Sequence, residues 1–407
     1  MAAVSLEQAI ELIRLHTPAA KAEEVPLFSA AGRILREDVI SAIMQPSFDR
    51  SPLDGYAVRA ADICGASERN AKCLRVTSCI YAGEEAKAPV HAGEAARIMT
   101  GAMIPAGADC VIRQEDTEEK TSEEARLVYI KKEAAAGSNI CRKGEEYGRG
   151  ALLIKKGSRL DAAALAVAAG AGVTKLSVAK KLRAAVLITG DEVVEPGEDL
   201  LPGRIYDTNA YYIAARLGEL GVEVELIGKA GDQKEELCSK IKAALQQADL
   251  VITTGGVSVG EKDLVELSLR EMQAEIIFHG IKMKPGMPTL FAMYGEKMLL
   301  CLSGNPFSAA VPFELLIREI LAQYTGCDAY QIQKGVAQTK NAYLKKSPTR
   351  RFLRAHADTE HGTVSVYMPK AQENGQMRSM IGCDCLIDIP AGTQQVGAGE
   401  LVKVIWI

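Results

Sequence analysis

The sequence predicts a multidomain α/β plus β protein, because strands alternate with helices in one long segment and short strands fill the segments around it. Residues 181–325 place apolar strand runs such as AAVLITG and DLVITTGG between helical runs such as TNAYYIAARLGELG. Continuous apolar strands between helices indicate a doubly wound, mostly parallel sheet. Residues 44–137 and 326–407 show short strands interrupted by Gly and Pro or period-two alternation, which is typical of small β domains.

Length and composition fit a folded multidomain chain. The 407 residues predict roughly two to four domains. Hydrophobic residues make up 48% and charged residues 25% of the chain, which excludes disorder, collagen and coiled coil. A formal net charge of −4 argues against nucleic acid or an anionic membrane surface as a partner.

The chain shows no sign of export or membrane insertion. No apolar run reaches the roughly 18 residues that a membrane span needs. Glu7, Glu11 and Arg14 interrupt any signal-peptide core at the start. The ten cysteines are scattered, without the spacing of a disulfide framework or a CxxC metal site. We therefore expect a reduced, cytoplasmic protein.

The first domain is expected to be discontinuous. Ser5 and Gln8 form a capping-box pattern before a first amphipathic helix, and AAGRILREDV predicts a second helix within residues 1–43. Residues 138–180 contain a glycine-rich stretch and a small-residue helix, DAAALAVAAGAG. Packing of this helix against the N-terminal helices would enclose the β domain of residues 44–137 as an insertion.

Polar residues follow four predicted strands of residues 181–325 at the edge where ligands of parallel sheets bind. These residues are Asp191, Glu192, Asp232, Gly255, Gly256, Ser258, Gly260, Asp263 and the SGNPFS turn at 303–308. Glycine-rich turns beside helix N-termini bind anions, and nearby carboxylates bind divalent cations. Together they predict a site for a phosphorylated or pyrophosphate-bearing ligand.

Each of these features also has a purely structural interpretation. Asp232 with Glu235 and Asp263 with Glu266 have capping-box spacing, and Asp207-Thr208-Asn209 is a good helix start. Asp49 and Asp54 stand among prolines, where a turn is the simpler interpretation. The arginines of TRRFLR fit a solvated face as well as an oxyanion site. Only the convergence of several loops at one edge favours a ligand site.

Seven ordered segments resemble one family. They are PSFDRSPLDGYAVRAADI, GEAARIMTGAMIPAGADCVIRQED, TGDEVVEPGE, GRIYDTN, GGVSVGEKD, KPGMP and SGNPFSA. Together they are similar to the MoeA family of molybdopterin molybdenumtransferases, which includes the E domain of gephyrin. The resemblance implies an elongated four-domain homodimer with a MogA-like α/β domain and a small C-terminal β-barrel.

The resemblance also implies a reaction. Molybdate is inserted into adenylylated molybdopterin, and Mg²⁺-dependent cleavage of the pyrophosphate linkage releases AMP and molybdenum cofactor. The implied partners are the pterin substrate, molybdate, a second copy of the chain and the adenylyltransferase of the preceding step. Two alternatives remain open: a pterin-binding scaffold that inserts no metal, and a paralogue that prefers tungstate.

The family motifs assign site residues by position. Asp54 and Thr100 would reach the site from the partner subunit, and Glu192, Asp232 and Asp263 would hold metal and phosphates. Residues expected to cradle the ligand are Gly255, Gly256, Ser258, Asn305, Pro306 and Ser308. Residues expected to form the molybdate pocket are Lys284, Arg350, Arg354 and Ser379.

Three positions depart from the family pattern. Glu146 stands in GEE where the family has GED, and Ser303 precedes GNP where the family has proline. Met287 stands in KPGMP where the family has a second lysine. The methionine removes one oxyanion donor, worth roughly 1.5–3 kcal/mol when charged. Arg378 is a candidate to compensate for it.

Overall fold

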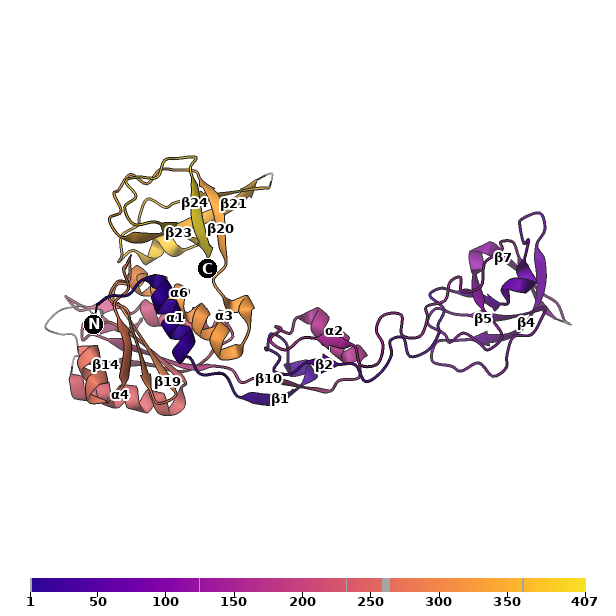
Figure 1. Ribbon diagram of the computed structural model, residues 1–407, viewed down its shortest axis with the longest axis horizontal. Helices are drawn as coiled ribbons and strands as arrows, with labels where there is room; N and C mark the ends of the chain where they lie inside the picture. The colour runs from indigo at the N-terminus through magenta and orange to yellow at the C-terminus, as the bar shows by residue number, and fades with distance from the viewer. Residues whose placement is uncertain (1, 124, 232, 258–263, 361) are drawn as a thin grey trace.

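A computed structural model describes residues 2–407 except 124, 232, 258–263 and 361. The molecule is elongated (Figure 1). The α/β part and the C-terminal β part lie together at one end, the small β domain lies at the other, and a slender middle part joins them. None of the helices in the described part of the chain combines the length and apolar character of a membrane span.

The first helix, α1 (Leu6–His16), begins with the predicted capping box: Ser5 Oγ accepts from Gln8 N, and Gln8 Oε1 accepts from Ser5 N. This helix packs on α6 (Pro306–Thr325), and Arg14 bonds to Glu319. The second helix predicted at AAGRILREDV is wrong. Gly32 has φ +73°, and the residues after it are extended, because Ile34 and Leu35 form β-bridges with Arg159 and Val178.

The middle part is built from two segments that are distant in sequence. β1 (Ala22–Pro26) pairs antiparallel with β10 (Lys175–Ala179), and β2 (Val39–Ile40) pairs with β9 (Leu152–Ile154). The predicted small-residue helix is α2 (Ala162–Gly170), capped by Asp161, and it packs against the 3₁₀ turn η1 (Leu27–Ser29) rather than against α1. The chain therefore leaves this part and returns to it, as a discontinuous domain requires.

The small β domain is a six-stranded sheet in the order β6-β3-β5-β4-β8-β7. Its strands are β3 (Gly55–Val58), β4 (Lys72–Ile80), β5 (Glu94–Ile98), β6 (Cys110–Arg113), β7 (Thr117–Thr121) and β8 (Arg126–Ile130). Short 3₁₀ turns, η2 (Ala60–Ile63) and η3 (Gln114–Asp116), interrupt it. The pairings are antiparallel except that of β4 with β5.

The α/β domain has the sheet order β14-β11-β15-β19-β18-β16. The strands are β11 (Arg183–Thr189), β14 (Glu223–Ala230), β15 (Leu250–Thr254), β16 (Glu275–His279), β18 (Leu290–Tyr294) and β19 (Lys297–Leu302). The first four in spatial order are parallel. β18 runs antiparallel to β19, and β16 in turn runs antiparallel to β18. This mostly parallel sheet is what the continuous apolar strand runs predicted.

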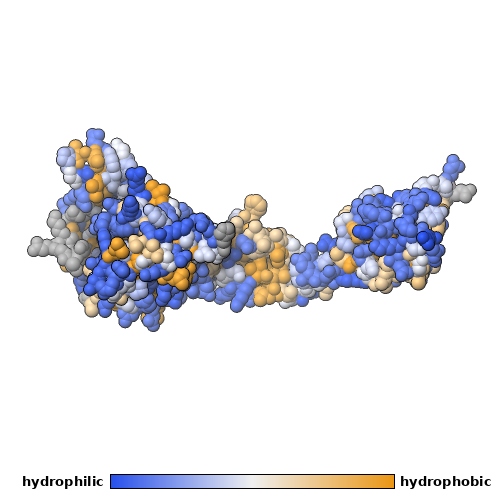
Figure 2. All heavy atoms as spheres, turned by 90° about the horizontal axis from the view of Figure 1, so that it is seen from above, coloured by the Kyte–Doolittle hydropathy of each residue, from blue (hydrophilic) through white to orange (hydrophobic). Residues whose placement is uncertain are grey.

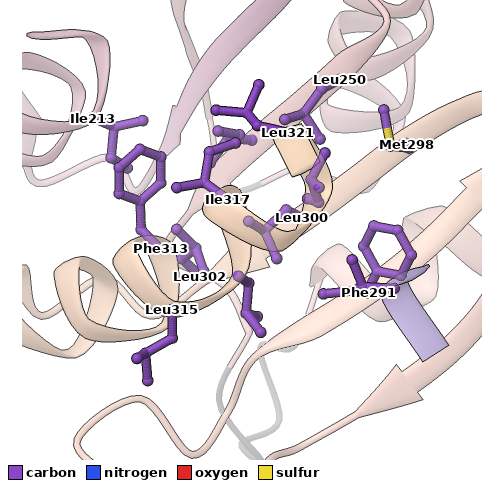
Figure 3. Close-up of a cluster of buried hydrophobic side chains, with 14 of the residues drawn as sticks. Ile213, Leu250, Phe291, Met298, Leu300, Leu302, Phe313, Leu315, Ile317 and Leu321 are labelled. Carbon is purple, nitrogen blue, oxygen red and sulfur yellow. The ribbon is translucent and has the colours of Figure 1, made fainter. Parts of the chain in front are cut away.

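Helices cover both faces of this sheet. α3 (Asn209–Glu219) and α6 share one apolar core with the sheet, which includes Leu300 and Phe313 (Figure 3). α4 (Lys234–Gln247) and α5 (Leu264–Glu271) share the core on the other face. A two-stranded ribbon of β12 (Val193–Val194) and β13 (Ile205–Tyr206) extends beyond the end of β11.

The C-terminal domain is a closed five-stranded barrel. Its strands are β20 (Lys334–Thr339), β21 (Arg350–Glu360), β22 (Thr363–Tyr367), β23 (Cys385–Ile389) and β24 (Leu401–Trp406). The order β21-β22-β20-β24-β23 closes because β23 also pairs with β21. A short strand of the α/β segment, β17 (Met283–Lys284), joins the barrel alongside β21, and the 3₁₀ turns are η4 (Asp328–Tyr330) and η5 (Met377–Met380). The predicted fold class is confirmed, whereas its domain boundaries remain predictions.

Candidate functional site

The carboxyl ends of β11, β15 and β19 open into a cavity of about 480 Å³. Its walls come from four turns, at residues 188–193, 205–209, 254–256 and 303–306. Three of these turns are among the loops that the sequence placed at this edge. Gly255, Gly256, Asn305 and Pro306, which were predicted to cradle a ligand, line this cavity. The fourth turn, which contains Asp207, was expected to be only a helix start.

Glycine is required where the strand ends crowd together. Gly255 has φ +92°, and a Cβ there would lie 2.5 Å from Thr189 Oγ1 and 2.8 Å from the Thr189 carbonyl oxygen. Gly190 has φ +121°, and a Cβ there would lie 2.6 Å from Glu192 Oε2. The Glu192 carboxylate therefore lies beside the Gly190 backbone, whose positive φ favours glycine.

Asp207 links helix α3 to the cavity wall. Its Oδ1 accepts hydrogen bonds from the backbone N–H groups of Asn209 at 2.9 Å and Ala210 at 3.1 Å, which confirms the predicted helix start. Asn209 Nδ2 then donates to the Gly304 carbonyl at 2.8 Å. The second carboxylate oxygen of Asp207 is buried, and among the described residues it has no hydrogen-bond partner.

The metal-site prediction rests largely on residues that the structure does not describe. Asp232, Asp263 and Ser258 lie outside the described residues. No cluster of three His, Cys, Asp or Glu side chains occurs among the described ones. Glu192, the remaining member of the predicted set, offers carboxylate oxygens, which are ligands that suit Mg²⁺.

A second cavity of about 340 Å³ adjoins the first and shares Ser303 and Asn305 with it. It is lined by Lys284, which was predicted for the molybdate pocket, and by Ser308, which was predicted to cradle the pterin ligand. Met287 also lines it, with 47% of its surface exposed. Cationic and polar side chains from the barrel complete the wall: Tyr343, Lys345, Arg351, Gln372, Glu373 and Asn374.

The structure does not bring Arg350 to this cavity. Its guanidinium donates to both carboxylate oxygens of Asp388, at 2.8 and 2.7 Å, and also bonds to Glu7. The hydrogen bonds to Asp388 and Glu7 raise the pKa of Arg350 above its usual range. Arg350 therefore joins the barrel to α1.

Arg354 does not reach the cavity either, because its side chain is fully buried. It donates to the carbonyl oxygens of Glu373 at 2.7 Å and Gln376 at 2.9 Å, and it lies 3.7 Å above the Phe307 ring. Burial lowers the pKa of Arg354 to about 10. Arg354 thus fixes the segment 372–376, which forms one wall of the cavity.

Ser379 also lies away from the residues that line this cavity. It belongs to η5, and its hydroxyl donates to the Gln376 carbonyl at 2.9 Å. Arg378, the residue expected to compensate for Met287, lies exposed in the same turn and does not line the cavity. The sequence left Arg351 open between a solvated face and an oxyanion site, and the family motifs did not assign it to the pocket, although it lines the cavity. Side chains alternate between the two faces of a strand, so Arg351 projects to the opposite face of β21 from Arg350 and Arg354. This alternation could have been recognised in the sequence.

Asp54 and Thr100 come together with each other but not with Glu192. Asp54 Oδ1 accepts from the backbone N–H and the hydroxyl of Thr100, both at 2.7 Å. These two bonds, the backbone one first, lower the pKa of Asp54 below its usual value. The pair lies beside β3 and β5, at the opposite end of the molecule from the α/β domain (Figure 1).

Ser303 and Glu146, the other two positions that depart from the family pattern, lie in different parts of the molecule. Ser303 contributes to both cavities. Glu146 N donates to the Gln45 carbonyl in the connection between the middle part and the small β domain. Within one chain Glu146 lines neither cavity.

The fold and the paired cavities define a class: a multidomain protein whose doubly wound domain carries a ligand site at its strand ends. Three family models cover the chain in order: MoeA N-terminal region (domain I and II) at residues 4–172, probable molybdopterin binding domain at 185–323, and MoeA C-terminal region (domain IV) at 336–407. The chain belongs to the MoeA family.

Individual relatives agree with this assignment. A molybdopterin molybdenumtransferase of Staphylococcus epidermidis is 34% identical over 402 residues, which cover 99% of this chain and 95% of that protein. One of Staphylococcus aureus is 33% identical over the same coverage. A crystal structure of a molybdopterin biosynthesis MoeA protein from Pyrococcus horikoshii has a TM-score of 0.85 at 36% identity, and the match covers 100% of this chain and 99% of that one.

Proposed function

We propose that this chain is a molybdopterin molybdenumtransferase, which inserts molybdate into adenylylated molybdopterin and releases AMP. One observation carries the proposal: two cavities of different chemistry share the wall formed by Ser303 and Asn305. A reaction that joins an oxyanion to a large nucleotide-linked ligand needs two such neighbouring sites. Holding both reactants in place lowers the entropic part of the barrier.

The first cavity suits the adenylylated pterin. Backbone groups of Gly255, Gly256 and Asn305 line it, and glycine-rich turns of this kind bind phosphate groups. Glu192 would hold Mg²⁺ there together with Asp232 and Asp263. When bound, the ion neutralises charge that develops on the departing phosphate. The protein's own contribution is to orient the pyrophosphate linkage beside the second cavity.

The second cavity suits molybdate. Lys284 supplies a positive charge, and Ser308 and Asn305 supply uncharged donors. A dianionic oxyanion is bound most strongly by charged donors that have few competing partners.

A homodimer with shared sites would bring Asp54 and Thr100 to the α/β domain. Two observations support it. Those two residues lie at the far end of their own chain from the cavities. The middle part also carries exposed apolar side chains, including Phe28 at 98%, Leu152 at 53% and Ile40 at 50% exposure. The same part shows a broad hydrophobic region (Figure 2), as expected of an interface between subunits.

The test is AMP release from adenylylated molybdopterin with Mg²⁺, across a molybdate dilution series and without molybdate. Release that depends on molybdate at low concentration supports the transferase. Tight pterin binding without any molybdate-dependent release would contradict it and favour a scaffold, which the uncharged Met287 also favours. A parallel series with tungstate competing against molybdate distinguishes an enzyme that prefers the heavier oxyanion.

A further inference from the structure

Two cationic side chains lie next to each other on one wall of the second cavity. β17 and β21 run parallel, and Lys284 is the register partner of Arg351. Register partners in a sheet project to the same face. Both residues line the cavity, so two positive charges from different parts of the chain meet there.

Neither charge is neutralised by the protein in the described part of the chain. Arg351 donates from Nε to the Ser347 hydroxyl at 3.3 Å, and neither Lys284 nor Arg351 forms an ion pair with a described residue. The one carboxylate among the lining residues, Glu373, lies 3.4 Å from Lys345. Arg350, the next residue along the strand, shows the contrast, because two carboxylates hold it.

Apart from the paired Lys345 and Glu373, the rest of the wall is uncharged and held in place. Ser303, Asn305 and Ser308 line it from the start of α6, and Tyr343 lines it from the barrel. Arg354 fixes the segment 372–376 on the remaining side. Two adjacent cations surrounded by hydroxyl and amide groups match a small dianionic oxyanion, and the terminal nitrogens of an arginine bind two of its oxygens at once.

We propose that Arg351 is a substrate-binding residue that holds the oxyanion together with Lys284. This inference rests on the proposed function and names a residue for it. Arg351 supplies the second positive charge of a cavity in which Met287 is uncharged. Because Met287 lines the same cavity, a cation introduced at that position would act on the same ligand.

The test measures molybdate binding to the full-length wild-type chain without pterin, by equilibrium dialysis with molybdenum quantification. Arg351→Gln is expected to weaken binding about 10- to 100-fold, since one charged hydrogen-bonding partner is lost. Arg351→Lys keeps the positive charge but loses the two-pronged guanidinium, so its molybdate affinity should lie between those of the wild type and Arg351→Gln. The matched control is Lys346→Gln, which removes a nearby exposed charge that does not line the cavity and should leave binding unchanged.

A second variant tests whether the effect is one of charge. Met287→Lys introduced into Arg351→Gln is expected to recover most of the lost affinity. Wild-type affinity in Arg351→Gln would overturn the proposal, as would failure of Met287→Lys to recover any binding or absence of molybdate binding by the wild type. A different result would contradict the proposed function alone. If molybdate binding requires Arg351 but AMP release does not depend on molybdate, the chain is not a transferase, although the oxyanion site is still supported.

Discussion

Three arginines within five residues of β21 have three different environments. Arg350 forms ion pairs with Asp388 and Glu7. Arg354 is buried and donates hydrogen bonds to the carbonyl oxygens of residues 373 and 376. Arg351 lines a cavity. Their side-chain chemistry is identical, so the surroundings alone decide what each one does. An arginine with charged partners stabilises the fold, whereas one without them is available to a ligand.

Glu192 is the described carboxylate through which the metal-site prediction can be tested. Glu192→Gln removes the negative charge while keeping the side chain's size, and we expect AMP release to fall roughly 100-fold or more. The melting temperature should stay close to wild type because Glu192 is exposed. Glu195→Gln serves as the control, because Glu195 is exposed in the same loop but does not line the cavity. Undiminished turnover in Glu192→Gln would refute the assignment.

The Asp54–Thr100 pair makes a prediction about pH. Because hydrogen bonds from Thr100 lower the pKa of Asp54, the stability they contribute is present above the ordinary carboxyl pKa and lost as pH falls through the lowered one. Thr100→Val removes the hydroxyl bond and keeps the backbone bond. We expect the pKa of Asp54 to rise, measured by a carbon-13 NMR titration of its carboxyl group. An unchanged pKa would mean that the hydroxyl contributes nothing.

At the scale of elements, the segment 372–376 depends on one buried side chain. Arg354→Leu removes the guanidinium that donates to the carbonyl oxygens of Glu373 and Gln376, and a hydrogen bond from a charged group contributes about 1.5–3 kcal/mol. We expect a lower unfolding free energy in urea and faster amide hydrogen exchange across 372–376. Arg378→Leu, an exposed position in η5, should show neither effect. Equal exchange rates in Arg354→Leu and wild type would contradict the positioning role.

Residues 30–39 form a turn and two β-bridges instead of the expected helix, for a reason that also lies at the scale of elements. The run AAGRILREDV has helical spacing of its apolar residues, yet Ile34 and Leu35 are buried by bridging to Arg159 and Val178. Those partners lie more than a hundred residues further along the chain. Local periodicity cannot register such pairing, so tertiary contacts overrode the local preference.

At the scale of the whole molecule, a shared site predicts complementation between two inactive variants. Asp54→Asn and Glu192→Gln would each inactivate every site of their own homodimer. In mixed dimers one of the two sites carries both changes and the other carries neither. Random mixing should therefore restore about a quarter of wild-type AMP release.

The mixing experiment also has a clear negative result. The two variants must first be exchanged between dimers by mild denaturation and refolding, with each one treated alone as the control. Activity that stays at the level of the separate variants would show that Asp54 and Glu192 do not serve a common site across subunits. The elongated shape makes this informative, because within one chain the two residues lie at opposite ends (Figure 1).

The sequence by itself determined the features that depend on neighbouring residues. Apolar strand runs between amphipathic helices specified the doubly wound domain, Ser5 and Gln8 specified the start of α1, and Asp207 specified the start of α3. The glycines after β11 and β15 marked the ligand edge, because only glycine tolerates those backbone angles at such close approach. These properties are set within a few residues.

Only the tertiary structure decided which side chains share a cavity. Lys284 meets Arg351 because β17 leaves the α/β domain and pairs with the barrel. Hydrogen bonds to Asp388 and Glu7 keep Arg350 away from the cavity, and hydrogen bonds to the segment 372–376 keep Arg354 away from it. The availability of a charge for a ligand depends on which opposite charges and carbonyl groups the fold places beside it, and those lie far away in sequence.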